Sequence, residues 1–288
     1  MTNPTESEKI ASLATQILKK EISVLKINRL GNDYTVATIN DGVQDLIVKT
    51  GPGIEAEYLA LSTLATINFP SPRIVGYIEG ATIMTKLDGI EIRDLSASNR
   101  FRIIPEVFDA VEKLRACKSP IQSGNILDVS KGKRIAWKDY LNQVVNSAAS
   151  ELPGNSNDID ESLILNTIQL ITKGLEELPG DIQLTLLHND VNLTNCILDK
   201  DCLLGVIDWG DAIYGDWLYD MARLRMNLEQ LSDVASLGLY KEKIKEVESR
   251  EQLYYVCRLL EYLAIYKRYG KDYGVTNNQT LLSQVLSR

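Results

Sequence analysis

The stretch HNDVNLTNCILDKDCLLGVIDWGD, residues 188–211, places polar residues around two short apolar runs. It contains His188, the only histidine in a chain of 288 residues, together with Asp190, Asn195 and Asp208. Each of these residues taken alone is common in turns, because Asp and Asn tolerate unusual backbone angles and bond to nearby backbone groups. Their combined spacing is more specific: H-x-D-x-x-x-x-N, an apolar hairpin, and then an aspartate.

The apolar runs 196–198 and 203–207 flank the turn sequence DKDC and predict a β-hairpin. If the hairpin is centred on that turn, Asn195 and Asp208 lie opposite each other at its open end. Cross-strand neighbours have Cβ atoms about 4.5–5.5 Å apart, close enough to share one cation. Amide and carboxylate oxygens are hard ligands of the kind that Mg²⁺ prefers, with phosphate oxygens completing its octahedron. The hairpin therefore predicts a magnesium-phosphate site.

Asp190 and His188 are the remaining polar groups at the start of the stretch. A carboxylate beside a metal-phosphate site can accept the proton of an attacking hydroxyl group, and the spacing gives this role to Asp190. Kinase catalytic loops have the same Asp-to-Asn spacing, followed later by a second metal-binding Asp. A lone histidine is more often packed or hydrogen-bonded than catalytic. We therefore expect His188, at the end of the apolar run LTLLH, to hold the loop in shape.

The bulk composition, with 44% hydrophobic and 24% charged residues, is that of an ordinary soluble globular protein. The net charge of −8 and the pI near 4.9 argue against a nucleic-acid partner, which usually requires a basic face. No stretch of the sequence approaches the roughly 20 apolar residues that span a bilayer, and its polar start is not a secretory signal. Four cysteines without a Cys-x-x-Cys pair are expected to be buried free thiols. We expect a cytoplasmic protein that contacts neither nucleic acid nor membrane.

The chain before residue 88 predicts a small sheet with one inserted helix. Thr5 and Glu8 form a capping box ahead of helically spaced apolar residues, and the sequence NDG at 40–42 is a hairpin signal. The expected order is helix, three strands, helix, two strands, with strands at 23–30, 34–39, 43–49, 73–79 and 82–87. The second helix carries apolar residues on one face: Ile54, Tyr58, Leu61, Leu64 and Ala65.

From residue 88 onward the pattern is mostly helical. Helical periodicity is found at 100–116, 136–150, 158–178, 216–228 and 251–269. Neither an internal repeat nor a flexible linker interrupts the chain. We predict an α+β protein of two lobes: a small antiparallel-sheet lobe at 1–87 that binds a nucleotide, and a mainly helical lobe at 88–288 that carries the catalytic loop and the acceptor pocket.

The small lobe supplies candidate partners for phosphate groups. Lys49 ends an apolar strand, and Glu57 lies early in the following helix, where it can hold the lysine ammonium toward ATP phosphates. For either residue alone, a solvated lysine or an exposed glutamate is the simpler interpretation. Gly31 and Asn32 lie in the connection between the first two strands, where a loop covering the nucleotide belongs, although this loop has a single glycine.

Together these motifs resemble the aminoglycoside phosphotransferase family, relatives of choline kinase with a protein-kinase-like fold. LIVKT, EAEYLALSTL, FPSPRIVGY and IMTKLDG are similar to the small lobe of that family, in the same order. HNDVNLTNCIL and GVIDWGDAIYGDWLYDMARL resemble its catalytic loop, metal-binding segment and following helix, and are the most specific part. The likeness extends from about residue 24 to 225. The family's usual H-G-D is H-N-D here, so Asn189 must adopt the backbone angles of a glycine, which Asn tolerates better than most residues.

The resemblance implies a bilobal protein-kinase-like fold that uses Mg²⁺ and ATP, with GTP as an alternative. It also implies a role for each matching residue. The implied roles are Asp190 as catalytic base, Asn195 and Asp208 as magnesium ligands, Lys49 with Glu57 at the phosphates, the backbone from Met84 to Leu87 at the adenine, and Asp216 and Asp220 as structural supports of the catalytic loop.

The expected activity is transfer of the γ-phosphoryl group of a nucleoside triphosphate to a hydroxyl group of a small molecule. An aminoglycoside-type antibiotic is the first expectation for this acceptor, and VIDWGDAIYGD favours the hygromycin branch. Choline, homoserine, a sugar or methylthioribose are alternative acceptors. A nucleotide-binding protein without transferase activity is a further alternative, but retention of Asp190, Asn195, Asp208 and Lys49 together speaks against it. The sequence leaves the oligomeric state open.

Overall fold

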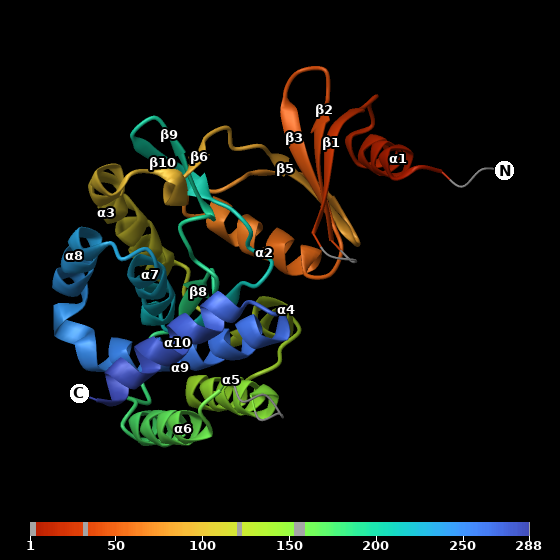
Figure 1. The fold of residues 1–288 in the computed structure, drawn as a ribbon. Helices are drawn as coiled ribbons and strands as arrows, with labels where there is room; N and C mark the ends of the chain where they lie inside the picture. The colour runs from red at the N-terminus through yellow and green to blue at the C-terminus, as the bar shows by residue number, and fades with distance from the viewer. Residues whose placement is uncertain (1–3, 31–33, 120–122, 153–158, 288) are drawn as a thin grey trace.

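The computed structural model describes residues 4–30, 34–119, 123–152 and 159–287. Figure 1 shows a twisted sheet with its helix near the N-terminus and a larger helical part that contains the C-terminus. The first part consists of α1 (Glu6–Leu18), β1 (Ser23–Leu30), β2 (Tyr34–Asn40), β3 (Asp45–Thr50), α2 (Ile54–Ala65), β4 (Ile74–Ile78) and β5 (Ala81–Thr85). The predicted order of helix, three strands, helix and two strands is confirmed.

The five strands form one antiparallel sheet in the order β1-β2-β3-β5-β4. The turn between β2 and β3 lies where the NDG sequence predicts it, with Asn40 in register with Asp45. Asp41 stabilises this turn because its Oδ1 accepts hydrogen bonds from the backbone N–H groups of Val43 and Gln44, each at 2.9 Å.

Helix α1 begins at the predicted capping box, where Thr5 Oγ1 accepts a hydrogen bond from the Glu8 N–H group at 3.2 Å. Ile10 and Ala14 on its inner face are buried against the sheet. Together with buried residues of β2, β3 and β5 they form a small hydrophobic core of their own.

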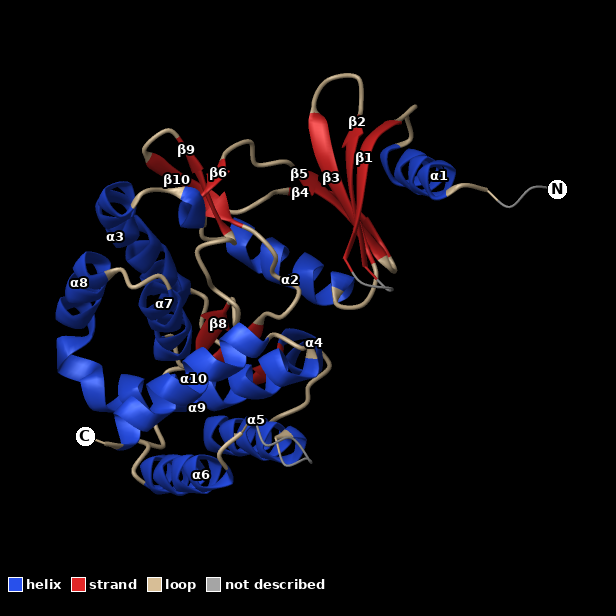
Figure 2. Cartoon of the chain, in the orientation of Figure 1, coloured by secondary structure: helices blue, strands red, loops and turns tan. Residues whose placement is uncertain are grey.

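The second part contains the remaining elements, and Figure 2 shows that most of it is helical. They are β6 (Ile90–Glu91), α3 (Ala97–Lys113), β7 (Gly124–Asn125), α4 (Ile126–Ser130), α5 (Trp137–Glu151), α6 (Glu161–Glu176), β8 (Thr185–Leu187), β9 (Cys196–Asp199), β10 (Cys202–Val206), β11 (Ile213–Gly215), α7 (Leu218–Gln230), α8 (Val234–Ile244), α9 (Glu248–Arg268) and α10 (Asp272–Leu286). The sequence patterns do not predict α4, α8, α10 or the short strands β6, β7, β8 and β11. The predicted α+β fold, with a small sheet lobe and a helical lobe, is confirmed.

A large hydrophobic cluster continues from the helical part into α2. Leu61 and Leu64 of α2 are buried in it, as are Leu259 and Leu263 of α9. In Figure 1, α2 lies between the five-stranded sheet and the helical part. Helix α2 therefore fixes the sheet to the helical lobe, although it is inserted between two strands of the small lobe. Among the described helices, none combines the length and the apolar character needed to cross a membrane.

Strands β9 and β10 form the predicted hairpin, but its register is shifted by a β-bulge between Leu203 and Gly205. The Ile207 N–H group donates a hydrogen bond to the Asn195 carbonyl oxygen at 2.9 Å. Ile207 therefore faces Asn195 at the open end of the hairpin, and Asp208 lies one residue further on. The expectation that Asn195 and Asp208 are opposite each other is wrong. Regular pairing from the turn would place Val206 opposite Asn195, and the bulge moves this partner by only one residue, to Ile207.

All four cysteines are free. Cys117, Cys196 and Cys257 are buried, as expected. Cys202 is exposed, so the expectation is wrong for this residue. The reason is its position at the start of β10, directly after the hairpin turn.

Candidate active site

The loop that follows β8 is held in place by a buried carboxylate from α7. Asp220 accepts hydrogen bonds from the backbone N–H groups of His188 at 2.7 Å and Asn189 at 2.9 Å. Burial raises the pKa of Asp220, and the nearby His188 and Arg258 oppose that rise. Asn189 has a φ of 72°, the left-handed conformation expected from its place in H-N-D. Asp220 thus supports the loop, as the resemblance implies.

His188 has no exposed surface, and both of its ring nitrogens are engaged. Nδ1 accepts a hydrogen bond from the Asp190 N–H group at 3.3 Å, so Nε2 carries the proton and donates to the Ile207 carbonyl oxygen at 2.8 Å. The imidazole also lies against Trp209, with ring centroids 4.5 Å apart. His188 therefore connects the loop to the β9–β10 hairpin, as expected, and is enclosed too fully to exchange a proton with an acceptor.

Asp190 receives three hydrogen bonds on its carboxylate. Oδ1 accepts from Arg223 Nε at 2.9 Å and from the Tyr262 hydroxyl group, while Oδ2 accepts from Asn192 Nδ2 at 3.0 Å. About a third of the side chain, 33%, is exposed. Burial alone would raise the pKa of Asp190, but Arg223 and the Tyr262 hydroxyl outweigh it and lower the pKa. Asp190 is therefore an ionised carboxylate that remains partly open to solvent.

Asn192 is a central residue of this loop that the sequence reasoning missed. Its Oδ1 accepts hydrogen bonds from the N–H groups of Thr194 at 2.9 Å and Asn195 at 3.1 Å. The resulting turn brings Asn195 next to Asp190, and Asn195 Nδ2 donates to the Asp190 carbonyl oxygen at 3.1 Å. That bond directs the amide nitrogen of Asn195 inward and leaves its amide oxygen as the outward group.

Asp208 has a φ of 69° and lies in the turn that follows β10. Its side chain is 61% exposed, and its Oδ1 accepts a hydrogen bond from Lys49 Nζ at 2.9 Å. The next residue, Trp209, is fully buried and its Nε1 donates to the Val206 carbonyl oxygen at 2.8 Å. The buried indole anchors the turn, and Asp208 extends from it toward the small lobe.

Lys49 of β3 contacts a carboxylate from each lobe. Its Nζ lies 2.8 Å from Glu57 Oε1 and 2.9 Å from Asp208 Oδ1. Glu57 is only 2% exposed and its Oε1 also accepts a hydrogen bond from the Trp209 N–H group at 3.3 Å. Burial would lower the pKa of Lys49, but the two carboxylates raise it overall, so the ammonium stays charged. The simpler interpretations, a solvated lysine and an exposed glutamate, are therefore wrong.

Two segments are predicted at the nucleotide: the backbone from Met84 to Leu87 at the base, and the loop with Gly31 and Asn32 over the phosphates. Met84 lies inside β5, in register with both β3 and β4, and is 3% exposed. Leu87 is partly buried and lies beyond the end of β5, where the backbone leaves the sheet. Gly31 and Asn32 lie outside the residues that the structure describes.

Helix α9 adds contacts to the loop that no motif indicates. Arg258 Nη2 donates to the backbone oxygen and to Oδ1 of Asn189, each at 2.7 Å, and its guanidinium lies 3.6 Å from the ring centroid of Tyr219. Tyr262, four residues later, donates its hydroxyl hydrogen to Asp190. Residues at i and i+4 share one helix face, which is the only sequence signal for this pair.

Asn195 and Asp208 carry oxygen donors of the kind that Mg²⁺ takes together with phosphate groups. Asn195 offers an amide oxygen, and Asp208 offers a carboxylate oxygen beside the one that contacts Lys49. Within the described ranges, no group of three or more His, Cys, Asp or Glu side chains could hold a metal ion without other ligands. An amide and a carboxylate leave the other positions of an octahedron to phosphate and water oxygens, as is usual for Mg²⁺ beside a nucleotide.

A third aspartate extends the negative charge of this region. Burial raises the pKa of Asp211, and the charges of Asp190 and Asp208 raise it further. Burial and the charge of Glu261 raise the pKa of Tyr140 to about 12, and Asp211 acts in the same direction. Asp211 is therefore influenced by the charges of Asp190 and Asp208, which are themselves paired with Arg223 and Lys49.

A pocket of about 360 Å³ lies between α5 and α9. Tyr140 and Glu261 line it, together with Ser147, Glu151 and Arg268. The size is within the usual range for small-molecule sites, which is about 300–1,000 Å³.

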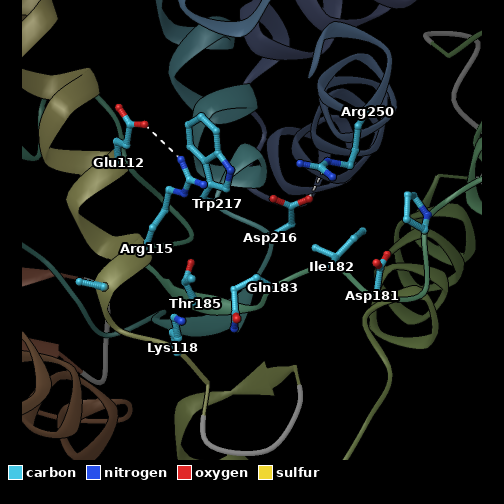
Figure 3. A pocket seen from close by; sticks show the side chains of 12 residues that line it. Glu112, Arg115, Lys118, Asp181, Ile182, Gln183, Thr185, Asp216, Trp217 and Arg250 are labelled. Atoms are coloured by element: carbon cyan, nitrogen blue, oxygen red, sulfur yellow. Dashed lines mark hydrogen bonds and ion pairs between the residues drawn. The ribbon is translucent and has the colours of Figure 1, made fainter. Parts of the chain in front are cut away.

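A second pocket of about 760 Å³ lies away from the residues predicted for the site (Figure 3). Its walls carry three cations and three carboxylates: Arg115, Lys118, Arg250, Glu112, Asp181 and Asp216. The dashed lines in Figure 3 join Glu112 to Arg115 and Asp216 to Arg250, so most of this charge is paired.

Asp216, which lines that second pocket, supports the catalytic loop only indirectly. Its Oδ1 accepts a hydrogen bond from the Leu218 N–H group at 3.2 Å, and its Oδ2 accepts one from the Tyr254 hydroxyl at 2.9 Å. It therefore fixes the start of α7, the helix that carries Asp220.

Comparisons with known proteins agree with this geometry. The model of a family described as "Phosphotransferase enzyme family" (APH) matches residues 26–243. The hygromycin-B 4-O-kinase of Escherichia coli is 20% identical over 167 residues, which are 56% of this chain and 48% of that protein. The match thus spans about half the length of that curated relative.

Solved structures resemble almost the whole chain. A thermostable mutant of aminoglycoside phosphotransferase APH(4)-Ia, in ternary complex with AMP-PNP and hygromycin B, has a TM-score of 0.77 at 14% identity, covering 97% of this chain and 98% of that chain. A putative fructosamine-3-kinase from Thermobifida fusca has a TM-score of 0.69 at 16% identity, covering 97% and 99%. These likenesses show that the fold is shared.

The fold and the arrangement of the site define a kinase-like phosphotransferase. Because the family model covers most of the chain, this protein belongs to the phosphotransferase enzyme family that includes the aminoglycoside phosphotransferases. The family predicted from the sequence is confirmed.

Proposed function

We propose that this protein is an ATP-dependent small-molecule kinase that phosphorylates a hydroxyl group of a cationic acceptor, first of all an aminoglycoside-type antibiotic. The observation that carries the proposal is the contact of Lys49 with both Glu57 and Asp208. It sets a charged ammonium from the small lobe beside the loop that bears Asp190 and Asn195. Phosphoryl transfer needs these parts: a cation for the phosphates, oxygen ligands for magnesium, and a group that receives a proton.

Asp190 orients the acceptor hydroxyl and accepts its proton. The acceptor oxygen forms a bond to the γ-phosphorus, the bond from that phosphorus to the β,γ-bridging oxygen breaks, and the hydroxyl proton moves to the Asp190 carboxylate. The products are the phosphorylated acceptor and a nucleoside diphosphate. Because the pKa of Asp190 is low, the carboxylate is ionised before the acceptor arrives and the proton moves late, as the new bond forms.

Lys49 binds the α- and β-phosphates, and Glu57 holds its ammonium group in place. Asn195 and Asp208 would hold Mg²⁺, which offsets the charge of the phosphate oxygens when it is bound. The four side chains come from β3, α2, the loop after β8 and the turn after β10. Phosphates bound between the lobes would contact Lys49 directly and Asn195 and Asp208 through the metal, while Glu57 acts through the lysine.

The backbone that follows β5 meets the nucleotide base. Met84 lies inside the sheet, between β3 and β4. The polar backbone groups at Leu87 are beyond the end of the strand, so they are the part of the predicted segment that faces a base. Gly31 and Asn32 belong to the loop proposed to cover the phosphates.

The acceptor binds at the exposed part of the Asp190 side chain, and the pocket between α5 and α9 is proposed to hold part of it, because α9 also carries Tyr262 at Asp190. Asp211 is the carboxylate that can attract an ammonium group of the acceptor, because Glu261 is already paired with Arg258. Hygromycin B is the first acceptor to test, because the curated relative is a hygromycin-B kinase and a structural neighbour binds it.

The test is an ADP-release assay with magnesium and ATP over a panel of acceptors. The panel holds hygromycin B, gentamicin, a fructosamine, choline and homoserine, and the Asp190→Asn variant is the matched control. We expect an aminoglycoside to give the highest kcat/KM and Asp190→Asn to lower kcat by about 10²–10⁴-fold, the usual scale of base catalysis. A wild-type rate in a folded Asp190→Asn variant would contradict the mechanism. ATP binding without turnover against the whole panel would instead favour a nucleotide-binding protein without transferase activity.

A further inference from the structure

Helix α9 lies beyond the last residue that the family model matches, yet it contacts the catalytic loop at two points. Arg258 binds Asn189, and Tyr262 binds Asp190. Tyr262 is 9% exposed, and its ring packs under the guanidinium of Arg223, whose carbon lies 4.1 Å from the ring centroid. The phenol and the guanidinium therefore reach Asp190 as one packed unit.

The two oxygens of the Asp190 carboxylate are occupied unequally. An ionised carboxylate has about two acceptor positions on each oxygen. Oδ1 accepts from both Arg223 Nε and the Tyr262 hydroxyl, so its positions are filled. Oδ2 accepts only from Asn192 Nδ2 among the described residues. One position on Oδ2 is thus left for an acceptor hydroxyl.

We propose that Tyr262 is a positioning residue that fixes the rotation of the Asp190 carboxylate and so presents Oδ2 to the acceptor. This inference rests on the proposed function, in which Asp190 receives the proton. If Arg223 were the only donor to Oδ1, the carboxylate could rotate about that single hydrogen bond. The Tyr262 hydroxyl supplies a second donor from a different helix, and two donors from different directions hold the plane of the carboxylate.

The donor role of Tyr262 fits its surroundings. Burial raises the pKa of its phenol, so the hydroxyl keeps its proton and donates it to the carboxylate. Arg223 stays charged, because its neighbours outweigh the effect of burial and raise its pKa. Neither group faces the nucleotide site around Lys49, so loss of the hydroxyl leaves nucleotide binding intact.

The test compares Tyr262→Phe with the matched control Tyr266→Phe. Tyr266 lies one turn further along α9 and bonds Gln230. The substrate is ATP with magnesium, and water replaces the acceptor hydroxyl, so no acceptor needs to be known. We expect Tyr262→Phe to lower kcat about 10-fold, the scale of one hydrogen bond to a charged group, with the KM for ATP unchanged. The control is expected to keep the wild-type kcat.

A double-mutant cycle separates positioning from a general structural effect. If Tyr262 acts through Asp190, Tyr262→Phe has no further effect on the residual rate of Asp190→Asn. Rates are normalised to the number of nucleotide-binding sites, so partial unfolding does not mimic the result. A wild-type kcat in Tyr262→Phe, or an equal fall in both backgrounds, overturns the proposal. A wild-type rate in Asp190→Asn contradicts the proposed function instead. If water gives no measurable ATP turnover, the same comparison is made with the acceptor of highest kcat/KM in the panel, and no turnover with any acceptor contradicts the proposed function.

Discussion

The two sides of the candidate site are built over different distances in the sequence. On the small-lobe side, Lys49 and Glu57 lie eight residues apart. On the helical side, Arg223 and Tyr262 reach Asp190 from 33 and 72 residues away. The small-lobe side is one strand and the helix that follows it, whereas the helical side depends on the packing of α7 and α9 against the loop. A local motif can therefore reveal the first side but only part of the second.

The comparison also separates direct from indirect roles. In the proposed function, Asp208 and Lys49 contact metal and phosphate, while Glu57 and His188 hold other groups in position. We expect the loss of a contacting group to cost more activity than the loss of a supporting group, whichever lobe it comes from. The four substitutions below are therefore given from the largest expected loss of activity to the smallest.

Asp208→Ala should give the largest effect. Loss of a magnesium ligand removes several kcal/mol of charge stabilisation, which corresponds to a fall in kcat/KM of about 10³-fold. The fold should be retained, because the side chain is 61% exposed. Magnesium-dependent ATP turnover and circular dichroism of the purified variant check both points. Near-normal turnover in a folded protein would remove Asp208 from the site.

Lys49→Ala should lower kcat/KM by about 10²–10³-fold, because a fixed cation at the phosphates acts on charge in the transition state. Steady-state kinetics with ATP and magnesium measure the change. Lys20→Ala is a suitable control, since Lys20 is a small-lobe lysine that also pairs with an aspartate, Asp41, but lies outside the residues assigned to the nucleotide. A wild-type kcat/KM in Lys49→Ala would show that the small-lobe side of the site is wrongly assigned.

Glu57→Gln should reduce kcat/KM about 10-fold, the scale of one hydrogen bond to a charged group. The amide keeps the shape of the carboxylate but removes one of the two charges that hold Lys49. Steady-state kinetics with ATP and magnesium measure this fall in kcat/KM. A sharper test compares the Lys49→Ala variant with the double variant that also carries Glu57→Gln. A further fall in that background would mean that Glu57 acts on something besides the lysine.

His188→Gln should have the smallest effect on catalysis and a clear effect on stability. Its ring joins the Asp190 N–H group to the Ile207 carbonyl oxygen, and a glutamine cannot satisfy both with the same geometry. We expect a loss of about 1–3 kcal/mol in the free energy of unfolding, typical of a buried polar group left unpaired. Urea denaturation measures the loss. An inactive His188→Gln beside an active Asp190→Asn would reverse the two roles.

The elements that sequence patterns predict well are long and strongly periodic. The bounds of β1 (Ser23–Leu30) are as predicted, and α2 (Ile54–Ala65) contains all the apolar residues predicted for it, because apolar side chains recur at strand and helix spacing. Helix α10 (Asp272–Leu286) is not predicted because its sequence, DYGVTNNQTLLSQVL, is rich in weak helix formers. Packing against α9 stabilises it, for example through Asn278, whose Nδ2 donates to the Leu259 carbonyl oxygen.

Sequence patterns likewise predict only part of the candidate site. The types and order of Asp190, Asn195 and Asp208 are visible in the sequence, but the bulge that places Ile207 opposite Asn195 is not, since it depends on the local register of the hairpin. The contacts of Tyr262 and Arg258 cannot be read from the sequence either. They depend on where α9 packs, and no local pattern specifies a contact over 72 residues.

The contact between Lys49 and Asp208 also bears on the form in which the nucleotide enters. Before ATP arrives, the ammonium is already neutralised by two carboxylates, so phosphate oxygens must compete with Asp208 for the same donor. Metal-free ATP brings only negative charge toward Asp190, Asp208 and Asp211. With the magnesium complex, the metal would pair with Asp208 while the phosphate oxygens pair with Lys49. The proposed function therefore predicts that the protein discriminates between the two forms of the nucleotide as they enter, before an acceptor binds.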